Sequence, residues 1–381
     1  MAGPLSGRTV VELAGQGPVP FAGMMLADMG AEVIRVERMP GRRATWKDHQ
    51  RTDTLARGRR SIQVDLKHPR GAEVVLRLVD GADALVEGFR PGAAERLGVG
   101  PEPCLSRRPA LVYGRMTGWG QHGPNAHRAG HDLNYLALTG ALHSIGLAGG
   151  PPVPPLNLIA DYGGGGMLLA FGVVCGLLEA DRSGQGQVID AAMIDGVAAL
   201  MAPFYAMSAA GHWSERRGTN ILDSGAPFYA VYETSDGRHL SVAAIEPKFY
   251  RALLGALGTD PADLPPQLDR ASWPGTKERL AAIFRTRTLK EWCAVFEEVD
   301  ACVAPVLTPL EAVTHPHAAA RGAFTQVAGI PQPAPAPRFG RTPGTTPTPT
   351  PLPGAHTRDV LLEAGFAAGD VEELRAQGIV A

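Results

Sequence analysis

Short apolar runs alternate with helical patterns over the first third of the chain. The expected strands are 9–13, 32–36, 61–65, 84–87 and 111–116, and the expected helices between them include 21–29 and 69–80. Most of the runs are rich in β-branched residues, as strands are, and the segments between them repeat apolar positions three or four residues apart. Strands separated by helices predict an α/β fold with a parallel, doubly wound, Rossmann-like sheet.

The pattern changes after residue 155. Residues 156–207 are rich in glycine and apolar side chains and predict packed helices over 167–180 and 193–210. Two strand patterns, 227–234 and 239–244, then flank a Ser-Asp-Gly hairpin signal. Further helices are expected over 248–257, 277–285, 289–296 and 359–374, with a surface arm rich in Pro and Thr over 329–353. The expected domains are a large domain, 1–188 completed by 324–381, a helical linker, 189–224, and a smaller α+β domain, 225–323.

Composition narrows the classes of function. The 36 Lys and Arg residues nearly balance the 38 Asp and Glu residues, for a net charge of -2, so no overall field attracts nucleic acid or an anionic membrane. The N-terminus lacks a basic segment before an apolar one, and the apolar stretch 167–178 is shorter than the ~20 residues that span a bilayer. We therefore expect a cytoplasmic protein. We also expect reduced, buried thiols and no metal centre, because the cysteines form no CxxC pair: Cys104, Cys175, Cys293 and Cys302.

The turn after the first strand disfavours a dinucleotide ligand. Gly15 and Gly17 match the start of a GxGxxG motif, but Pro20 stands where the third glycine belongs. Pro18 and Pro20 also lack the N–H groups that would hold a pyrophosphate. We expect no NAD or FAD site at this turn.

Basic residues gather after three of the expected strands. Because the carboxyl ends of parallel strands meet at one edge of a sheet, we expect Arg38 and Arg90 to share a crevice suited to an anionic, phosphate-bearing ligand. The alternative for any single arginine is a solvated loop charge. The basic set comprises Arg35, Arg38, Arg42, Arg43, Arg57, Arg59, Arg60, Lys67, Arg90 and Arg96.

Three titratable residues occupy positions suited to proton transfer. His131 precedes an expected helix whose N-terminus favours a neutral imidazole, although a histidine can also merely cap a helix. Asp161 precedes four glycines, 163–166, and is either an N-cap or a carboxyl beside bare backbone whose amides bind a developing oxyanion. Glu246 ends an apolar strand before a helix that starts with Pro, where it either caps the helix or orients a histidine.

Several segments together resemble the α-methylacyl-CoA racemases of the type III CoA-transferase superfamily. They include ADMGAEVIRV (27–36), GFRPG (88–92), GHDLNY (130–135), PPLNL (154–158), GAPFY (225–229), AIEP (244–247) and DACVAPV (300–306). The similarity runs along nearly the whole chain. The segments around His131, Asp161 and Glu246 mark the racemase branch, whereas the early segments are shared by the superfamily. Two departures are Leu133 in place of Ile and Ser224 in place of Gly.

The resemblance implies an interlocked homodimer of chains with a Rossmann-like large domain and a small domain. The site then lies between the large domain of one subunit and the small domain of the other. His131 and Asp161 would be the catalytic bases, and Glu246 of the partner subunit would support the histidine. No cofactor is implied, because CoA is part of the substrate. The implied CoA-binding residues are Arg38, Val64, Asp65, Leu66, Lys67, Gly88, Phe89, Arg90, Arg96, Gly130, Asp132, Leu133, Asn134 and Tyr135.

The implied reaction inverts C2 of a 2-methylacyl-CoA thioester through an enolate. One group removes the α-proton from one face of the molecule, and a second group delivers a proton to the other face. With ordinary pKa values of about 6.5 for His and about 3.9 for Asp, Asp161 would be ionised at neutral pH. We therefore expect burial to raise its pKa, or the pair to share one proton. Apolar residues over 193–205 and 227–229 suit an apolar acyl group.

Two alternatives remain open at this stage. Asp161 could attack a thioester as the nucleophile of a CoA transferase and form a mixed anhydride, a reaction that needs neither His131 nor Glu246. Transferases of this type tend to carry a glycine-rich loop in the small domain, which the stretch 243–250 lacks. A silent CoA-binding protein would keep the basic residues without needing both His131 and Asp161.

Overall fold

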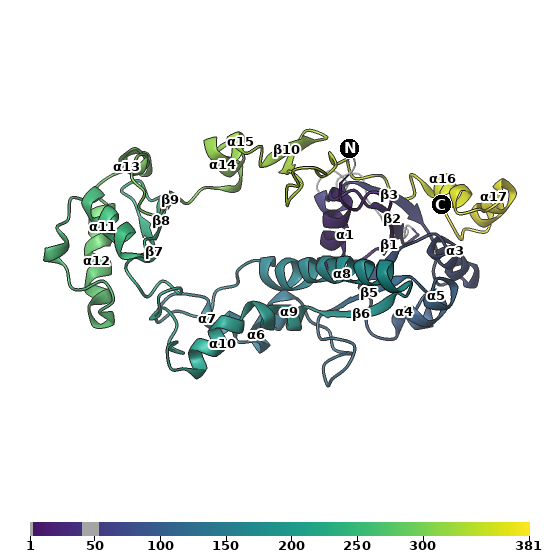
Figure 1. The fold of residues 1–381 in the computed structure, drawn as a ribbon, viewed down its shortest axis with the longest axis horizontal. Coiled ribbons are helices and arrows are strands. Elements are labelled where there is room, and N and C mark those ends of the chain that lie inside the picture. Colours follow the sequence, from purple (N-terminus) through teal and green to yellow (C-terminus); the bar gives the residue numbers. More distant parts are fainter. Residues whose placement is uncertain (1–2, 40–52) are drawn as a thin grey trace. The chain divides into compact units, whose positions relative to one another are not determined.

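Six parallel strands form the central sheet of the first compact unit of the chain (Figure 1). The structure is a computed structural model that describes residues 3–39 and 53–381. The sheet order is β3-β2-β1-β4-β5-β6 with every neighbouring pair parallel, which confirms the Rossmann-like α/β fold. The sixth strand, at one edge, was not expected. The strands are β1 Thr9–Leu13, β2 Glu32–Glu37, β3 Arg59–Gln63, β4 Ala84–Glu87, β5 Val112–Thr117 and β6 Gln187–Ala192.

Helices cover both faces of this sheet, because successive strand residues face opposite sides. On one face, Leu169 and Val173 of α8 lie over Gly114 of β5, and α1 packs beside α8. On the other face, Leu85 and Tyr113 join a buried cluster with residues of α3, α5, α16 and α17. The helices are α1 Pro18–Asp28, α3 Pro69–Val79, α5 Pro101–Arg107, α8 Leu168–Ser183, α16 Thr357–Glu363 and α17 Ala368–Ala376.

The C-terminal segment covers the edge strand β3. The amide of His356 donates to the carbonyl of Ser61 at 2.9 Å. Past the end of the strand, the amide of Asp65 donates to the carbonyl of Ile379 at 2.8 Å. Backbone groups that an edge strand would leave open are thereby paired. Val64 and Asp65, two of the residues predicted to contact CoA, are held by the end of the chain.

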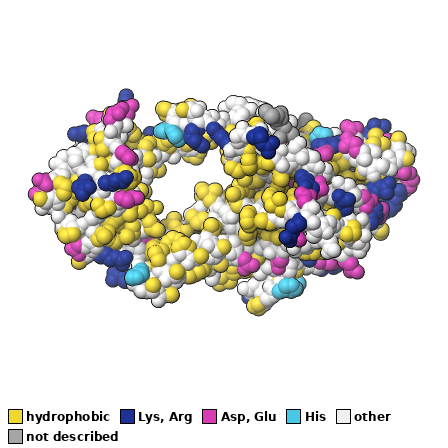
Figure 2. Space-filling view, in the orientation of Figure 1, with side chains coloured by type: hydrophobic (Ala, Val, Ile, Leu, Met, Phe, Trp, Pro, Cys, Tyr) yellow, Lys and Arg dark blue, Asp and Glu magenta, His cyan; other side chains and the backbone are white. Residues whose placement is uncertain are grey.

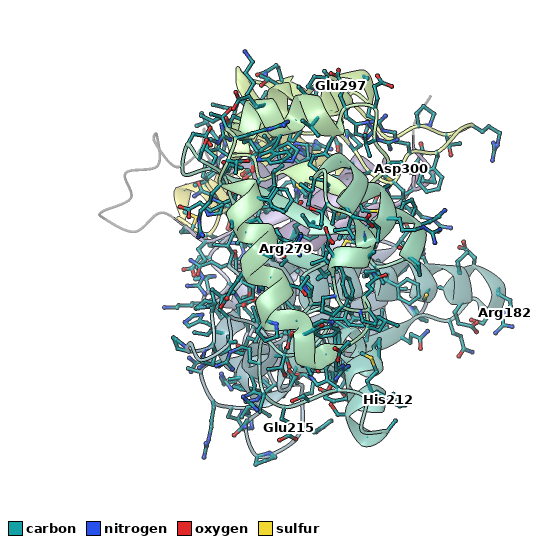
Figure 3. All side chains as sticks on the ribbon, turned by 90° about the vertical axis from the view of Figure 1, so that its left-hand side faces the viewer. Arg182, His212, Glu215, Arg279, Glu297 and Asp300 are labelled. Atoms are coloured by element: carbon teal, nitrogen blue, oxygen red, sulfur yellow. The ribbon has the colours of Figure 1, made fainter. Side chains whose placement is uncertain are left out.

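The second compact unit contains a three-stranded antiparallel sheet packed against helices. Its core includes Tyr232 and Phe284, whose rings stack with centroids 4.8 Å apart. Arg279 lies on the exposed side of α12 (Figure 3). The predicted hairpin is confirmed as β7 and β8. The elements are β7 Tyr229–Glu233, β8 His239–Ala243, α11 Pro247–Ala256, α12 Trp273–Phe284, α13 Leu289–Phe296 and β9 Val303–Pro305.

The chain crosses between the two units several times. The first unit contains the residues up to Thr139, then Leu156–Leu200 and His317–Ala381, and the second contains Gly140–Pro155 and Met201–Pro316. Residues before Leu200 that were expected in the linker therefore belong to the first unit, as β6 and α9. The remaining elements are η1 Thr54–Ala56, α4 Ala93–Arg96, α6 Asp132–Leu138, α7 Ala141–Ser144, η2 Leu158–Met167, α9 Met193–Leu200, α10 Ala202–Ala209, η3 Pro261–Asp263, η4 Arg270–Ser272, α14 Pro309–Thr314, α15 Pro316–Ala320, β10 Phe324–Val327 and β11 Ile330–Pro333.

The helix expected over 167–180 is part of a longer one that begins at Leu158. Its first ten residues, η2, are π-helical and continue directly into α8. By length and composition this 26-residue helix could cross a membrane, with a hydropathy of 1.6, and 44% of its most apolar window is buried inside the protein. The helices expected over 193–210 and 359–374 are each divided in two, as α9 and α10 and as α16 and α17.

The cysteines differ from the expectation in part. Cys104 is buried, but Cys175 and Cys302 are exposed and Cys293 is half-buried, and all four are free thiols. The expectation of buried thiols is therefore wrong for Cys175 and Cys302. Within residues 3–39 and 53–381, no group of three His, Cys, Asp or Glu side chains is placed to hold a metal ion.

Candidate active site

His131 stands at the start of α6. It is the N-cap of the helix, and its amide donates to Oδ1 of Asn134 at 3.0 Å, while the Asn134 amide donates to the His131 carbonyl at 2.7 Å. These two hydrogen bonds fix the backbone of His131. The residue itself is exposed. The predicted position at a helix N-terminus is therefore confirmed.

Asp132 joins this helix start to a second element. The residue is buried, and its Oδ2 accepts the amide of Ala160 at 2.8 Å and the amide of Asp161 at 2.9 Å. Both amides lie in the first turn of η2, where backbone N–H groups lack partners within the helix. One carboxylate oxygen therefore holds the beginnings of α6 and η2 together, with His131 on one side and Asp161 on the other.

The Asp161 carboxyl is half-buried beside the first turn of the sheet. Asn157, four residues earlier, donates from Nδ2 to its Oδ2 at 3.1 Å. A Cβ on Gly17 would lie 3.1 Å from the same oxygen, so the Gly-Gln-Gly-Pro turn packs against this carboxyl. Burial raises the pKa of Asp161 and the Asp132 charge raises it further, while the Asn157 hydrogen bond and the His131 charge lower it. The raised pKa agrees with the expectation, and the effect of His131 means that the two predicted bases are electrostatic neighbours.

The glycines after Asp161 serve packing. A Cβ on Gly164 would lie 2.8 Å from the Val197 amide nitrogen of α9, and one on Gly166 would lie 2.7 Å from the Phe21 ring of α1. The glycines therefore allow η2 to touch both neighbouring helices, and the expectation that they expose bare backbone to a ligand is wrong for Gly164, Gly165 and Gly166, which are buried. The amides of Ala160 and Asp161 are bound to Asp132, so they cannot receive an enolate oxygen as we expected.

The basic residues separate into two groups. Arg35, Arg57, Arg59 and Arg60 form ion pairs with carboxylates, such as Arg57 with Asp28 at 2.6 Å and both side chains almost fully buried. These four residues stabilise the fold, and each already has a carboxylate partner. Arg42 and Arg43 lie outside the described residues. Within the predicted basic set, the exposed residues with no ion pair to a carboxylate of residues 3–39 and 53–381 are Arg38, Lys67, Arg90 and Arg96.

Tyr135 lies near both a predicted CoA-binding residue and a predicted base. This phenol is buried in α6, and its ring meets the Trp119 ring edge-on with centroids 4.7 Å apart. Burial raises the pKa of Tyr135 to about 12, the Asp161 charge adds to the rise, and the Arg90 charge opposes it. Arg90 and Asp161 are therefore both close to one phenol.

The other predicted contact residues differ in accessibility. Val64 is 1% exposed and belongs to the core, bridging antiparallel to Val380, so its side chain is not available to a ligand. Leu66 and Phe89 also pack against that core in part. The positions left at least partly open are Asp65, Gly88, Gly130, Leu133 and Asn134.

Glu246 belongs to the second unit. It is exposed and is the N-cap residue of α11, without a hydrogen bond from its side chain to the helix. Ser224, one of the departures from the family, has a φ of 70°, in the left-handed region where glycine is favoured. Lys277 donates from Nζ to the Ser224 carbonyl at 2.5 Å, which helps hold that turn. Asn157 was missed, although its spacing of four residues from Asp161 on a helix could have indicated it. Gly17 had no comparable signal.

Taken together, the first unit presents a histidine and a carboxyl of raised pKa as neighbours, with unpaired cations on loops of the same unit. Such a pair can take up and release protons at two separate positions. The cations suit phosphate groups.

Comparisons with known proteins identify relatives of this chain. The sequence model of the CoA-transferase family III matches residues 5–357. The chain is 46% identical over 378 residues to "Alpha-methylacyl-CoA racemase" of Mus musculus and 44% identical over 378 residues to that of Homo sapiens, covering 99% of this chain and 97% of each relative. A CAIB/BAIF family protein from Brucella suis superposes with a TM-score of 0.83 at 25% identity, covering 96% of this chain and 100% of that structure.

Loss of the Asn157 hydrogen bond should raise the pKa of Asp161 further. In Asn157→Ala the carboxyl loses a donor that favours its ionised form. We expect the 13C carboxyl resonance of Asp161 to titrate at higher pH than in the native protein. Asn134→Ala, which removes an amide beside His131 but not one bonded to Asp161, is the control and should leave that titration nearly unchanged. A shift to lower pH in Asn157→Ala would contradict the described contact.

The close approach of η2 and α9 should make Gly196 intolerant of any side chain. A Cβ there would lie 1.9 Å from the Gly164 carbonyl oxygen. We expect Gly196→Ala to lower the free energy of unfolding by about 3 kcal/mol in urea titrations, because the two backbones must separate. Gly255→Ala is the control, since Gly255 is exposed on α11 and its Cβ would meet nothing within 4 Å. It should stabilise by about 1 kcal/mol through helix propensity. Equal effects of the two substitutions would argue against the packing.

Proposed function

The chain belongs to the CoA-transferase family III, and we propose that it is an α-methylacyl-CoA racemase that inverts C2 of 2-methylacyl-CoA thioesters. The identity of 44–46% to two racemases over 378 residues supports this activity. The observation that carries the proposal is the junction at Asp132, which ties the backbone of His131 to the element that holds Asp161.

Inversion of a carbon next to a thioester needs proton transfer on both faces. A single fixed side chain would return the proton to the face from which it came, so the configuration would be kept. Neutral His131 removes the α-proton from one epimer and becomes imidazolium, while protonated Asp161 delivers its proton to C2 on the opposite face. The product epimer leaves the enzyme with ionised Asp161 and charged His131, which is the state needed for the reverse direction.

The raised pKa of Asp161 supports this assignment. A carboxyl with an ordinary pKa would be almost fully ionised at neutral pH and would have no proton to donate. Because burial and the Asp132 charge raise the pKa, the protonated fraction of Asp161 at neutral pH is larger than for an exposed carboxyl. The shift is in the direction that the forward half-reaction needs.

The unpaired cations support CoA as the carrier of the acyl group. CoA has a pyrophosphate and a 3′-phosphate, and the exposed Arg38, Lys67, Arg90 and Arg96 have no carboxylate partner among the described residues. The acyl group is the part of the substrate molecule that must reach His131 and Asp161. The partly open residues Leu133 and Leu158, with 42% and 56% exposure, provide apolar surface next to the two bases in the sequence.

We further infer that two copies of the chain associate. The outer side of the long helix exposes Met167, Phe171 and Leu178 by 47%, 68% and 66%, at a spacing typical of one helix face. Figure 2 shows apolar side chains gathered where α8 and α9 lie in that view. A second copy covers this surface, and Glu246 of the partner subunit then supports His131. In a soluble, cytoplasmic dimer the second copy covers the exposed side of this apolar helix, and the opposite side of the helix is buried against the sheet. The helix then needs no membrane.

Isotope exchange tests the two-base reaction. The native protein in deuterated buffer should racemise each epimer of a 2-methylacyl-CoA and place deuterium at C2. His131→Ala and Asp161→Ala should each lower racemisation at least ~10³-fold, because each removes a general acid–base group. Each variant keeps one of the two groups and should therefore still exchange the α-proton of one epimer. The epimer that His131→Ala exchanges should differ from the one that Asp161→Ala exchanges.

The rival outcome is CoA transfer. If the native protein leaves C2 unlabelled but moves CoA to an added carboxylate, and hydroxylamine traps Asp161, then Asp161 is a nucleophile and the racemase proposal fails. Arg182→Gln, at the far end of the long helix that carries Asp161 in its first turns, serves as the control and should retain exchange with both epimers.

Charge placed on the apolar helix face should separate the subunits. We expect Phe171→Glu to sediment as a monomer and to lose racemase activity, because a carboxylate cannot be buried unpaired in the interface. Arg182→Gln, at the exposed polar end of the same helix (Figure 3), should leave the native sedimentation unchanged. A Phe171→Glu protein that sediments and reacts like the native one would exclude this surface from the interface.

A further inference from the structure

An ion pair at the ends of β4 and β5 has no part in the proton transfers. Glu87 is fully buried and Arg115 is 8% exposed, and the two residues are direct partners in the register of these neighbouring strands. Arg115 donates from Nε to Oε1 of Glu87 at 3.1 Å. A buried pair of this kind is costly to form and is weak as a source of stability, so another role for it is worth testing.

Each partner of the pair holds a segment that carries an unpaired cation. Oε2 of Glu87 accepts the amide of Phe89 at 2.6 Å, which fixes the loop immediately before Arg90. On the other side, Arg115 forms an ion pair through Nη1 with Oε1 of Glu95 at 2.8 Å. Glu95 belongs to α4, and the next residue of that short helix is Arg96.

We propose that Arg115 is a positioning residue that sets the separation of Arg90 and Arg96, so that both meet phosphate groups of the same CoA molecule. Arg115 reaches both segments at once through Glu87 and Glu95. It touches neither the thioester nor the two bases, and its effect is on binding of the nucleotide part of the substrate. This inference rests on CoA as the ligand of the proposed function.

The titration of Glu87 supports the link. Burial raises the pKa of Glu87 to about 7, while the Phe89 amide and the Arg115 charge hold it down, and Glu95 raises it slightly. The charged or titratable groups around it are Arg115 and Tyr113 on β5 and Glu95 on α4. Above pH 7 the ionised carboxylate accepts strong bonds from both partners, and these bonds weaken as the pH falls through 7. Without Arg115 the pKa rises, so Glu87 is protonated at neutral pH and the loop loses its charged anchor.

Comparing a substrate that carries the nucleotide phosphates with one that lacks them tests whether Arg115 positions the phosphate-binding arginines or only stabilises the fold. Arg115→Met and Glu95→Gln are compared with Arg57→Met, which also breaks a buried ion pair of the first unit but lies on neither segment. The measurements are the dissociation constant for CoA by titration calorimetry, and KM and kcat for C2 exchange of a 2-methylacyl-CoA and of the corresponding pantetheine thioester, which lacks all the nucleotide phosphates.

We expect Arg115→Met to raise the CoA dissociation constant and the acyl-CoA KM about tenfold, with kcat within about twofold of the native value. Glu95→Gln should raise both about threefold, because the link from Arg115 to α4 is lost while its pair with Glu87 remains. Arg57→Met should leave both within about twofold. With the pantetheine thioester all four proteins should have similar KM values. The KM of the native protein for acyl-CoA should rise below pH 7, and in Arg115→Met this rise should begin at higher pH.

Equal weakening by Arg115→Met and Arg57→Met, or a loss that persists with the pantetheine thioester, would overturn the proposal. If Arg115→Met does not fold, an unchanged CoA dissociation constant in Glu95→Gln would overturn it equally. A native protein that binds CoA with the expected pattern of variants but exchanges no C2 proton would support positioning and reject the racemase reaction.

Discussion

The buried carboxylate of Asp132 is the contact on which the candidate site depends. The chain leaves the first unit after Thr139 and returns at Leu156, so residues 140–155 of the polypeptide between the two predicted bases belong to the other unit. Asp132 holds the two bases together by accepting the amides of Ala160 and Asp161. Burial of a charge is costly, and two charge-assisted hydrogen bonds to otherwise unpaired helix amides offset that cost. The same charge also raises the pKa of Asp161, so one group supplies both the geometry and part of the proton affinity of the site.

Ion pairs with carboxylates decide which basic residues are available for a ligand. A net charge close to zero could arise from cations that are all paired, and in the first unit several are: Arg57 is bonded to Asp28 and Arg59 to Glu12, with both pairs buried. Four exposed cations of the predicted basic set that form no ion pair among the described residues, Arg38, Lys67, Arg90 and Arg96, lie after strands β2, β3 and β4. The Rossmann-like topology brings the carboxyl ends of these strands to one edge, so cations suited to an anionic ligand can gather there without any overall positive charge.

The glycine run after Asp161 illustrates how one pattern can have two physical causes. Four glycines permit a ligand to approach the backbone, and they also permit helices to pack at backbone distance. Gly164 and Gly196 face each other so closely that either Cβ would overlap the opposite backbone, and Gly166 meets α1 in the same way. Tight packing leaves no bare backbone there, but it does hold η2, and with it Asp161, against the turn at Gly17.

The sequence by itself determined the class of fold, five of the six parallel strands and the residue types of the two predicted bases, because these follow from local periodicity and from motifs. It also predicted that the pKa of Asp161 would be raised. The sixth strand, the division of the basic residues into paired and unpaired sets, and the contacts of Gly17 and Asn157 with Asp161 were decided only by the tertiary structure. Most of these depend on which segments distant in the chain meet, and hydrophobic periodicity contains no information about such partners. Asn157 is the exception, since its helical spacing from Asp161 is local, but that spacing identifies a contact only once the segment is known to be a helix.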